Sequence, residues 1–219
     1  MKVTRLGQAG LLFAAGDTTV LVDPYFTDSV PGVPRRKQVP ERVWDIKPDI
    51  LLITHDHIDH YDPETVKRFV NENTAATLLS PKSVWEKLPR PARGNNYVLV
   101  SPGVQWTQDG ITVTAVKARH SDPYAVGFAL NADGKSIYIT GDTLFFLDVS
   151  LPFESVDYVF LPINGRGNNM NAGDAAEFAG LIGAKTAVPV HYGLLDDLSP
   201  DIFEYKNKFV MEDFTEYDI

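Results

Sequence analysis

Hydrophobic residues along the chain either alternate with polar ones or form short runs, a pattern that predicts many short strands. The opening segment holds two or three of them, including Leu11–Ala15 and Thr18–Val22, with tight turns at Gly7 and at Gly16-Asp17. Residues 50–53 (Ile-Leu-Leu-Ile) form an uninterrupted apolar run, as expected of a strand buried on both faces.

The remainder of the chain mixes strands with helices. Further strands are predicted at Thr77–Ser80, 158–161 and 186–190, and the β-rich stretch 97–140 carries hairpin turns at Asp109-Gly110 and Asp133-Gly134. Helices are predicted at 63–70 and 81–88, each opened by a proline, and at 172–182 and 202–209. This order favours an α/β fold in which sheets are covered by helical layers. No linker or fixed-period repeat divides the chain, so we expect a single domain over residues 1–219.

Composition narrows the class of protein. With 219 residues and 44% hydrophobic content, the chain can form one medium-sized domain with a substantial core. Its formal net charge of -9 argues against a broad nucleic-acid-binding face, which must be positive to displace counterions. The run Arg35-Arg36-Lys37 is either a solvated loop or a local basic patch.

The absence of cysteine excludes disulfides, thiolate ligands and a cysteine nucleophile. The N-terminus lacks a signal-peptide core, and Gly16-Asp17 interrupts the early apolar stretches too soon for a membrane span. We therefore expect a cytoplasmic protein that has neither a membrane nor a nucleic acid as its partner. The oligomeric state cannot be inferred from the sequence.

All five histidines follow strand-like segments. Three lie in the run Thr54-His55-Asp56-His57-Ile58-Asp59-His60, and the others are His120 and His191. Asp142 stands at a matching position after Ile139-Thr140-Gly141. Four strand ends therefore each supply a side chain that can bind a metal ion, and strand ends are where α/β folds collect their sites.

The spacing within the run suits two neighbouring ions. Positions i and i+2 of a loop leaving a strand can turn toward one point, so His55 and His57 can hold one ion. Asp59 and His60 can hold a second, and Asp142 can reduce the repulsion between two cations by bridging them. Imidazole and carboxylate suit zinc, iron and manganese. We expect two divalent metal ions, zinc first, with manganese or iron as alternatives.

The run at 54–60 resembles the defining motif of the metallo-β-lactamase superfamily, and His120, Gly141-Asp142 and His191 resemble its remaining ligand motifs. Val22-Asp23-Pro24 is similar to the early structural aspartate of the same superfamily. Residues 161–166 and 191–193 look most like the ascorbate-6-phosphate lactonase-like group of metal-dependent hydrolases. The chain is short for the sugar-phosphate lactonase itself, so the resemblance does not carry that enzyme's substrate with it.

The resemblance implies a four-layer αββα sandwich with the site at one edge of the sheets. It assigns a first metal to His55, His57 and His120, and a second to Asp59, His60 and His191, with Asp142 as the bridge. Asp23 would support the ligands rather than bind metal. Asp56 is either a turn carboxylate or a supporting residue.

Two close metals can generate a hydroxide that attacks a carbonyl carbon or a phosphorus. Asp59 and Asp142 are the candidate catalytic residues, with Asp59 able to orient the water or carry its proton. If all five histidines bind metal, none remains to act as a general acid. The lack of a general acid favours a leaving group that needs little protonation, so we expect hydrolysis of a lactone or ester of a small anionic molecule.

The substrate residues are less evident from the sequence. Arg166 and Asn164, in the loop at 164–169, could bind a phosphate or carboxylate, or simply form an exposed turn. Arg35 and Arg36 could serve likewise if their loop folds over the metals. Tyr124 and Tyr192 flank ligand positions and are left unassigned.

Three alternatives stay open. The first is a phosphodiesterase that acts on a nucleotide or RNA, which the acidic balance disfavours. The second is a di-iron redox protein, although such proteins generally carry a flavin domain and a glutamate in place of Asp59. The third is a non-catalytic metal-binding module, which would have no need of two complete ligand sets.

Overall fold

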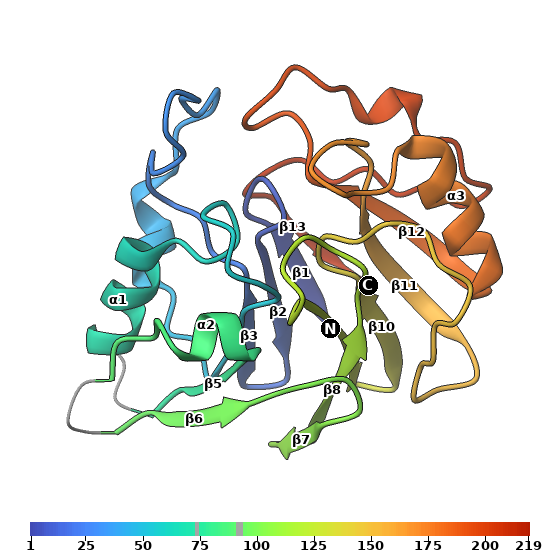
Figure 1. Ribbon diagram of the computed structural model, residues 1–219. Helices are drawn as coiled ribbons and strands as arrows, with labels where there is room; N and C mark the ends of the chain where they lie inside the picture. The colour runs from blue at the N-terminus through green and yellow to red at the C-terminus, as the bar shows by residue number, and fades with distance from the viewer. Residues whose placement is uncertain (73–74, 91–93) are drawn as a thin grey trace.

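Two β-sheets face each other in the middle of the protein, which a computed structural model describes over residues 1–72, 75–90 and 94–219 (Figure 1). Within these ranges the first sheet has the strand order β13-β1-β2-β3-β4-β5-β6 and the second the order β12-β11-β10-β9-β8-β7. The strands of the first sheet are β1 (Lys2–Arg5), β2 (Leu11–Ala15), β3 (Thr18–Val22), β4 (Ile50–Leu52), β5 (Thr77–Ser80), β6 (Asn96–Leu99) and β13 (Glu216–Asp218). Those of the second are β7 (Gln105–Gln108), β8 (Ile111–Lys117), β9 (Val126–Ala132), β10 (Lys135–Ile139), β11 (Val156–Pro162) and β12 (Ala184–Val190).

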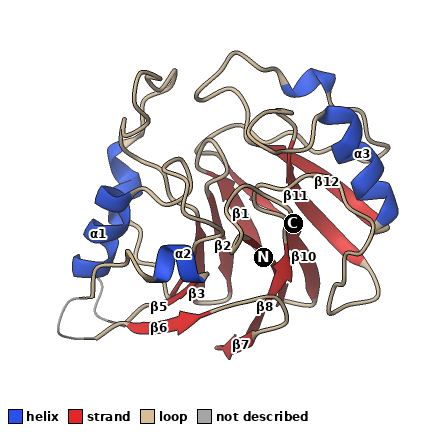
Figure 2. Ribbon diagram, in the orientation of Figure 1, coloured by secondary structure: helices blue, strands red, loops and turns tan. Residues whose placement is uncertain are grey.

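Helices cover the outer face of each sheet (Figure 2). On the first sheet lie α1 (Pro63–Glu72), α2 (Lys82–Trp85) and the 3₁₀ helix η1 (Glu41–Asp45), whereas α3 (Ala172–Leu181) lies on the second. A second 3₁₀ helix, η2 (Pro200–Ile202), follows β12. The architecture confirms the expected four-layer αββα sandwich. None of the helices in the described ranges is long and apolar enough to cross a membrane.

Three apolar clusters hold the four layers together. The central one fills the space between the sheets, where the rings of Phe13 and Phe160 meet edge to face with centroids 5.4 Å apart. A second cluster joins the outer face of the second sheet to α3 through Phe178, and a third joins the first sheet to α1 through Phe69. Each buried phenylalanine contributes on the order of 1.5–3 kcal/mol relative to an exposed one. Alternation along the strands thus places one apolar face inward and the other under a helix.

Several predicted elements are confirmed with their boundaries. β2, β3 and β5 coincide with the predicted strands. The hairpins β7–β8 and β9–β10 turn at Asp109-Gly110 and Asp133-Gly134, and all four of these residues have positive φ angles between 50° and 80°. Asp-Gly pairs favour such turns because both residues tolerate the left-handed region.

The predicted helix at 202–209 is wrong. Beyond η2 the chain is not helical: it turns at residues 206–207, and Lys208 forms a parallel bridge with Ala187 of β12. Phe203 is buried and Tyr205 half-buried between exposed neighbours, so the apolar spacing is two rather than three or four. The predicted helix at 81–88 is also longer than α2, and β13 was not expected.

The loops that carry the five histidines and Asp142 leave four different strands. They follow β4, β8, β10 and β12, which bring together residues far apart in sequence. Strands β3 and β4 are parallel, as are β10, β11 and β12, so several strand ends meet at one edge of the sandwich. The fold therefore places the predicted ligands at a common edge.

Candidate metal centre

The loop after β4 carries four of the predicted ligands. His55 and His60 are fully buried, whereas His57 and Asp59 are partly exposed. Backbone hydrogen bonds from the N–H groups of His60 and Tyr61 to the carbonyl of His57 close the loop into a tight turn. The turn directs the four side chains toward one region.

Four imidazoles each have one ring nitrogen in contact with a protein oxygen. The pairs are His55 Nδ1 with Thr54 Oγ1 at 2.9 Å, His60 Nδ1 with Asp23 Oδ2 at 2.8 Å, His57 Nε2 with Ser121 Oγ at 3.3 Å, and His120 Nδ1 with the carbonyl of Asn168 at 3.2 Å. Where these nitrogens donate, the tautomer is fixed and the opposite nitrogen has a free lone pair. This is the usual support for metal-binding histidines.

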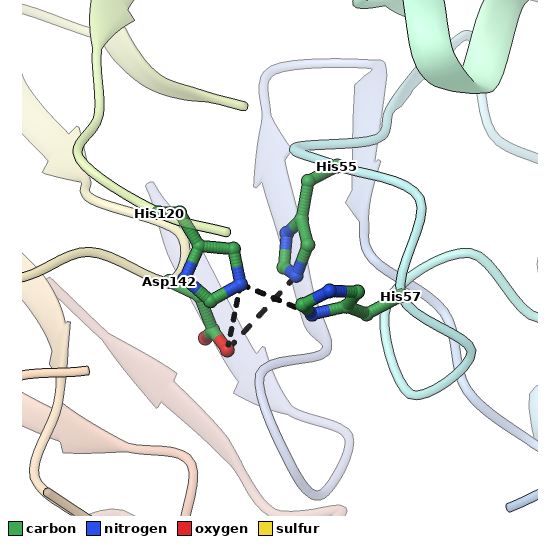
Figure 3. Close-up of side chains that lie close together, drawn as sticks. All are labelled: His55, His57, His120 and Asp142. Atoms are coloured by element: carbon green, nitrogen blue, oxygen red, sulfur yellow. Dashed lines mark hydrogen bonds and ion pairs between the residues drawn. The ribbon is translucent and has the colours of Figure 1, made fainter. Parts of the chain in front are cut away.

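The free nitrogens of three imidazoles converge with Asp142 (Figure 3). His57 Nδ1 lies 3.0 Å from His120 Nε2, and Asp142 Oδ2 lies 3.9 Å from His120 Nε2 and 4.0 Å from His55 Nε2. The ligand atoms of all four residues lie within 4.8 Å of one another. We call this set the first group.

Asp59, His60 and His191 form a second group beside it. Asp59 Oδ2 lies 3.3 Å from His191 Nε2 and 3.9 Å from His60 Nε2. Asp142 reaches this group as well, since its oxygens lie 3.2 Å from His60 Nε2 and 3.2 Å from His191 Nε2. Asp142 thus contacts ligand atoms of both groups.

Both groups fit divalent cations. Tetrahedral ligands at the usual 2.0–2.2 Å from an ion are about 3.3–3.6 Å apart, close to the spacings observed here. His55 Nε2 is buried, and the described residues offer it no hydrogen-bond partner. When their outer nitrogens carry the protons, His57 Nδ1 and His120 Nε2 face each other with two lone pairs. A cation between them would satisfy both.

The electrostatics of the metal-free groups separate the histidines into two kinds. Burial alone would lower the pKa of His60 and His191, but the carboxylates of Asp142 and Asp59 raise the pKa of His60 well above its usual value. The same carboxylates, Asp142 foremost, raise the pKa of His191 to about 10. Burial lowers the pKa of His55 and His120. Against the effect of burial, the nearby imidazolium groups hold the pKa values of Asp59 and Asp142 well below the usual range.

Asp23 adopts the supporting position that the resemblance implied. It is buried, and its carboxylate accepts hydrogen bonds from the Thr54 N–H at 2.8 Å, the Thr54 hydroxyl at 2.6 Å and His60 Nδ1 at 2.8 Å. Asp56 instead forms an ion pair with Lys87 at 2.5 Å.

Besides Ser121, which contacts His57, three side chains at the centre were missed by sequence reasoning. Gln8 contacts Asp59 and His191, Asn169 donates from Nδ2 to Asp142 Oδ2 at 2.8 Å, and Asp122 contacts the backbone of Asp56. The only sequence signals were a polar residue in the glycine-rich turn at 7–10 and polar residues close to His120 and Arg166.

The loop at 164–169 forms one wall of a cavity beside the two groups. The cavity has a volume of about 350 Å³ and is lined by His57, Asp59, Ser121, Asp142, Asn164, Arg166, Gly167, Asn168, Asn169 and His191. Every lining side chain is polar, apart from the single glycine. Both predicted substrate residues, Arg166 and Asn164, are in this wall.

The other basic and aromatic candidates have different surroundings. Arg35 donates to the carbonyl of Tyr25 at 2.5 Å and lies over the Tyr25 ring, and Lys37 pairs with Asp213 at 2.6 Å. Tyr192 packs against the guanidinium of Arg5, whereas Tyr124 is exposed. None of the candidates Arg35, Arg36, Lys37, Tyr124 and Tyr192 lines the cavity.

Comparison with known proteins agrees with this geometry. Residues 18–192 match the family model described as β-lactamase superfamily domain. A UPF0173 metal-dependent hydrolase of Thermoplasma acidophilum is 32% identical over 200 residues, covering 87% of this chain and 83% of the relative. Another, from Methanoregula boonei, is 33% identical over 222 residues, covering 94% and 88%. The solved structure of Igni18, a metallo hydrolase from Ignicoccus hospitalis, superposes with a TM-score of 0.79 at 21% identity, covering 100% of this chain and 98% of that one.

Proposed function

This chain belongs to the β-lactamase superfamily and is a metal-dependent hydrolase, and on that premise we propose that it cleaves a lactone or ester of a small anionic molecule with two divalent metal ions. The first ion would be held by His55, His57 and His120, and the second by Asp59, His60 and His191, with Asp142 between them. We also propose that all 219 residues form one domain.

The observation that carries this proposal is the arrangement of the imidazoles. Four of them contact a protein oxygen through one nitrogen, while the other nitrogen lies within a group of ligand atoms. A histidine cluster that served only packing would not need every free nitrogen to face the same carboxylates. Zinc suits this donor set, with manganese or iron as alternatives.

Two divalent ions held by these residues would lower the pKa of a bound water toward neutrality and would polarise the substrate oxygen. Asp59, which is ionised, can accept a hydrogen bond from the attacking water and orient it. The water oxygen forms a bond to the acyl carbon, and the bond from that carbon to the ring or ester oxygen breaks. The released oxygen then takes the proton that the water gave up.

The five histidines leave none for proton donation, because each belongs to one of the two groups. Leaving groups that need little protonation, such as those of lactones and activated esters, fit this inventory best. The resemblance of residues 161–166 and 191–193 to the ascorbate-6-phosphate lactonase-like group points the same way. A pH–rate profile with a second essential group near pH 6.5 would contradict this inference.

The polar cavity supports a small, charged substrate. Among the described residues the Arg166 side chain has no hydrogen-bond or ion-pair partner, so its guanidinium is available to a carboxylate or phosphate. The cavity volume of about 350 Å³ lies within the range of small-molecule sites. The wall offers no apolar side chain to hold a long acyl chain.

A substrate screen on reloaded protein tests the function. Metal-free protein reloaded with Zn²⁺, Mn²⁺ or Fe²⁺ is assayed on panels of lactones, carboxylic esters, phosphodiesters and β-lactams, with metal content measured by elemental analysis. We expect turnover of anionic lactones or esters. Turnover of phosphodiesters alone would instead indicate a phosphodiesterase that acts on a nucleotide or RNA. Two bound metals with no turnover would favour a redox protein or a non-catalytic metal-binding protein.

Arg166 is tested by a matched pair of variants. Arg166→Ala should raise KM for an anionic substrate about tenfold or more while kcat changes little, since the lost interaction is equal in the ground and transition states. Arg36→Ala is the control, because Arg36 is also exposed but lies outside the cavity. Equal KM values for the two variants would exclude Arg166 from substrate binding.

A further inference from the structure

Gln8 links two ligands of the second group. It lies in the turn between β1 and β2 with φ 48°, and its side chain is buried. Its Nε2 donates to Asp59 Oδ2 at 2.8 Å and lies 3.2 Å from both ring nitrogens of His191, which places the amide over the imidazole face. The main-chain carbonyl of Gln8 accepts a hydrogen bond from the main-chain N–H of His191 at 2.8 Å. Gln8 therefore holds His191 at both backbone and ring.

Asp122 has the corresponding position beside the first group. It is buried, and its carboxylate accepts from the Asp56 N–H at 3.2 Å, the Ser83 hydroxyl at 2.5 Å and the Tyr124 N–H at 2.8 Å. Asp56 lies between His55 and His57, and Asp122 follows His120 by two residues. Asp122 thus ties the loop after β4 to the loop after β8.

We propose that Gln8 and Asp122 are positioning residues, each for one metal group, so that the affinities of the two metals can be altered separately. The inference rests on the proposed two-metal function. It assigns Gln8 to the Asp59–His191 pair and Asp122 to the His57–His120 pair.

Neither residue acts on the other group in the described structure. Among the described residues the hydrogen bonds of Gln8 go to Asp59 and His191, and those of Asp122 go to Asp56, Ser83, Tyr124 and Ala125. Asp23, by contrast, contacts His60 of the second group directly and His55 of the first group through Thr54. Loss of a group that orients a ligand typically weakens metal binding by roughly 10–100-fold.

The test titrates metal-free protein with Co²⁺, whose absorption spectrum reports each site. His57→Ala and His191→Ala give the reference spectra of protein in which one group is broken. We expect Gln8→Leu to weaken the second metal at least tenfold and to leave the first within about threefold, with a spectrum approaching that of His191→Ala. We expect Asp122→Asn to weaken the first metal at least tenfold and to leave the second within about threefold, because the new side-chain N–H would oppose the Asp56 N–H.

Gln8→Met and Ser83→Ala remove contacts of the same two networks with less disturbance and serve if either first variant fails to fold. Asp49→Asn is the control for a general loss of stability, since Asp49 accepts from the N–H and hydroxyl of Thr19 far from the ligands. Equal weakening of both metals by each variant, or of neither, would overturn the inference. Wild-type protein that takes up fewer than two Co²⁺ ions would instead contradict the proposed function.

Discussion

Replacing Asp23 with asparagine should disturb both metals, because this carboxylate lies at the centre of a relay. His55 Nδ1 contacts the Thr54 hydroxyl, which donates to Asp23 Oδ2. The same carboxylate oxygen also accepts a hydrogen bond from His60 Nδ1. In Asp23→Asn, Oδ1 can still accept the Thr54 N–H, but an NH₂ group faces the hydroxyl and His60. Asparagine tolerates the positive φ of 42° at this position, so the backbone adds no new strain.

This reversal of hydrogen-bond direction should move a proton onto Nε2 of His60 and of His55, the nitrogens that are free to bind metal. His60 Nδ1 would have to accept, which places its proton on Nε2, and the reversed Thr54 hydroxyl would impose the same change on His55. Loss of an orienting partner costs roughly 10–100-fold in metal affinity, or about 1.4–2.7 kcal/mol per metal. Because Asp23 is buried, solvent screening does not reduce this cost.

Chelator competition measures the two dissociation constants. Thr54→Val should weaken mainly the first group, since it breaks the relay only on the side of His55. Asp49→Asn is closely matched, because Asp49 Oδ2 accepts from the N–H of Thr19 at 2.8 Å and its hydroxyl at 2.9 Å without contacting a histidine. If Asp23→Asn retained both metals with affinities within twofold of wild type, the reasoning would be refuted.

Three further outcomes follow from the structure. Arg5→Met should lower the free energy of unfolding by about 3 kcal/mol, the low end for breaking a buried pair, because Asp213 loses Arg5 but keeps the exposed Lys37. Lys2→Ala, which breaks an exposed pair, is the control in urea denaturation, and equal losses would contradict this. Metal-free protein should lose stability as pH rises from 6.5 toward 10, since His60 and His191 of the folded protein keep protons that the unfolded chain has released. In urea titrations with chelator the equilibrium constant of unfolding should rise up to tenfold per pH unit for each proton, and a flat profile would refute this. Gly141→Ala should lower Tm and weaken the first metal, because its Cβ would lie 2.9 Å from Thr54 Cβ, whereas Gly134→Ala, with similar positive φ but open space, should cost less; equal Tm values would show that the contact relaxes.

The sequence predicts those parts of the fold that depend on local pattern. β2 and β3 follow from the alternation on either side of Gly16-Asp17, and the two Asp-Gly hairpins follow from turn chemistry. The helix predicted at 202–209 is wrong because the non-helical form of this segment depends on pairing with Ala187 of β12, a partner that local propensity does not reveal. Its spacing of Phe203 and Tyr205 was the available signal.

The same distinction applies to the site. The ligand roles predicted for the run at 55–60 rest on short spacing and on resemblance, and the structure brings those side chains together with His120, Asp142 and His191. Gln8 and Asp122 could not be found this way. Gln8 meets His191 across 183 positions of sequence, and a polar residue beside glycines is an ordinary feature of turns.

The distribution of the ligands along the chain also orders their appearance during synthesis. The first group is complete once Asp142 has left the ribosome, but the second requires His191, about 50 residues later. At the usual rate of elongation this is a delay of roughly 2–10 seconds. Gln8, among the first residues made, meets His191 only after that interval. We therefore expect a nascent chain to bind one ion before it can bind the second.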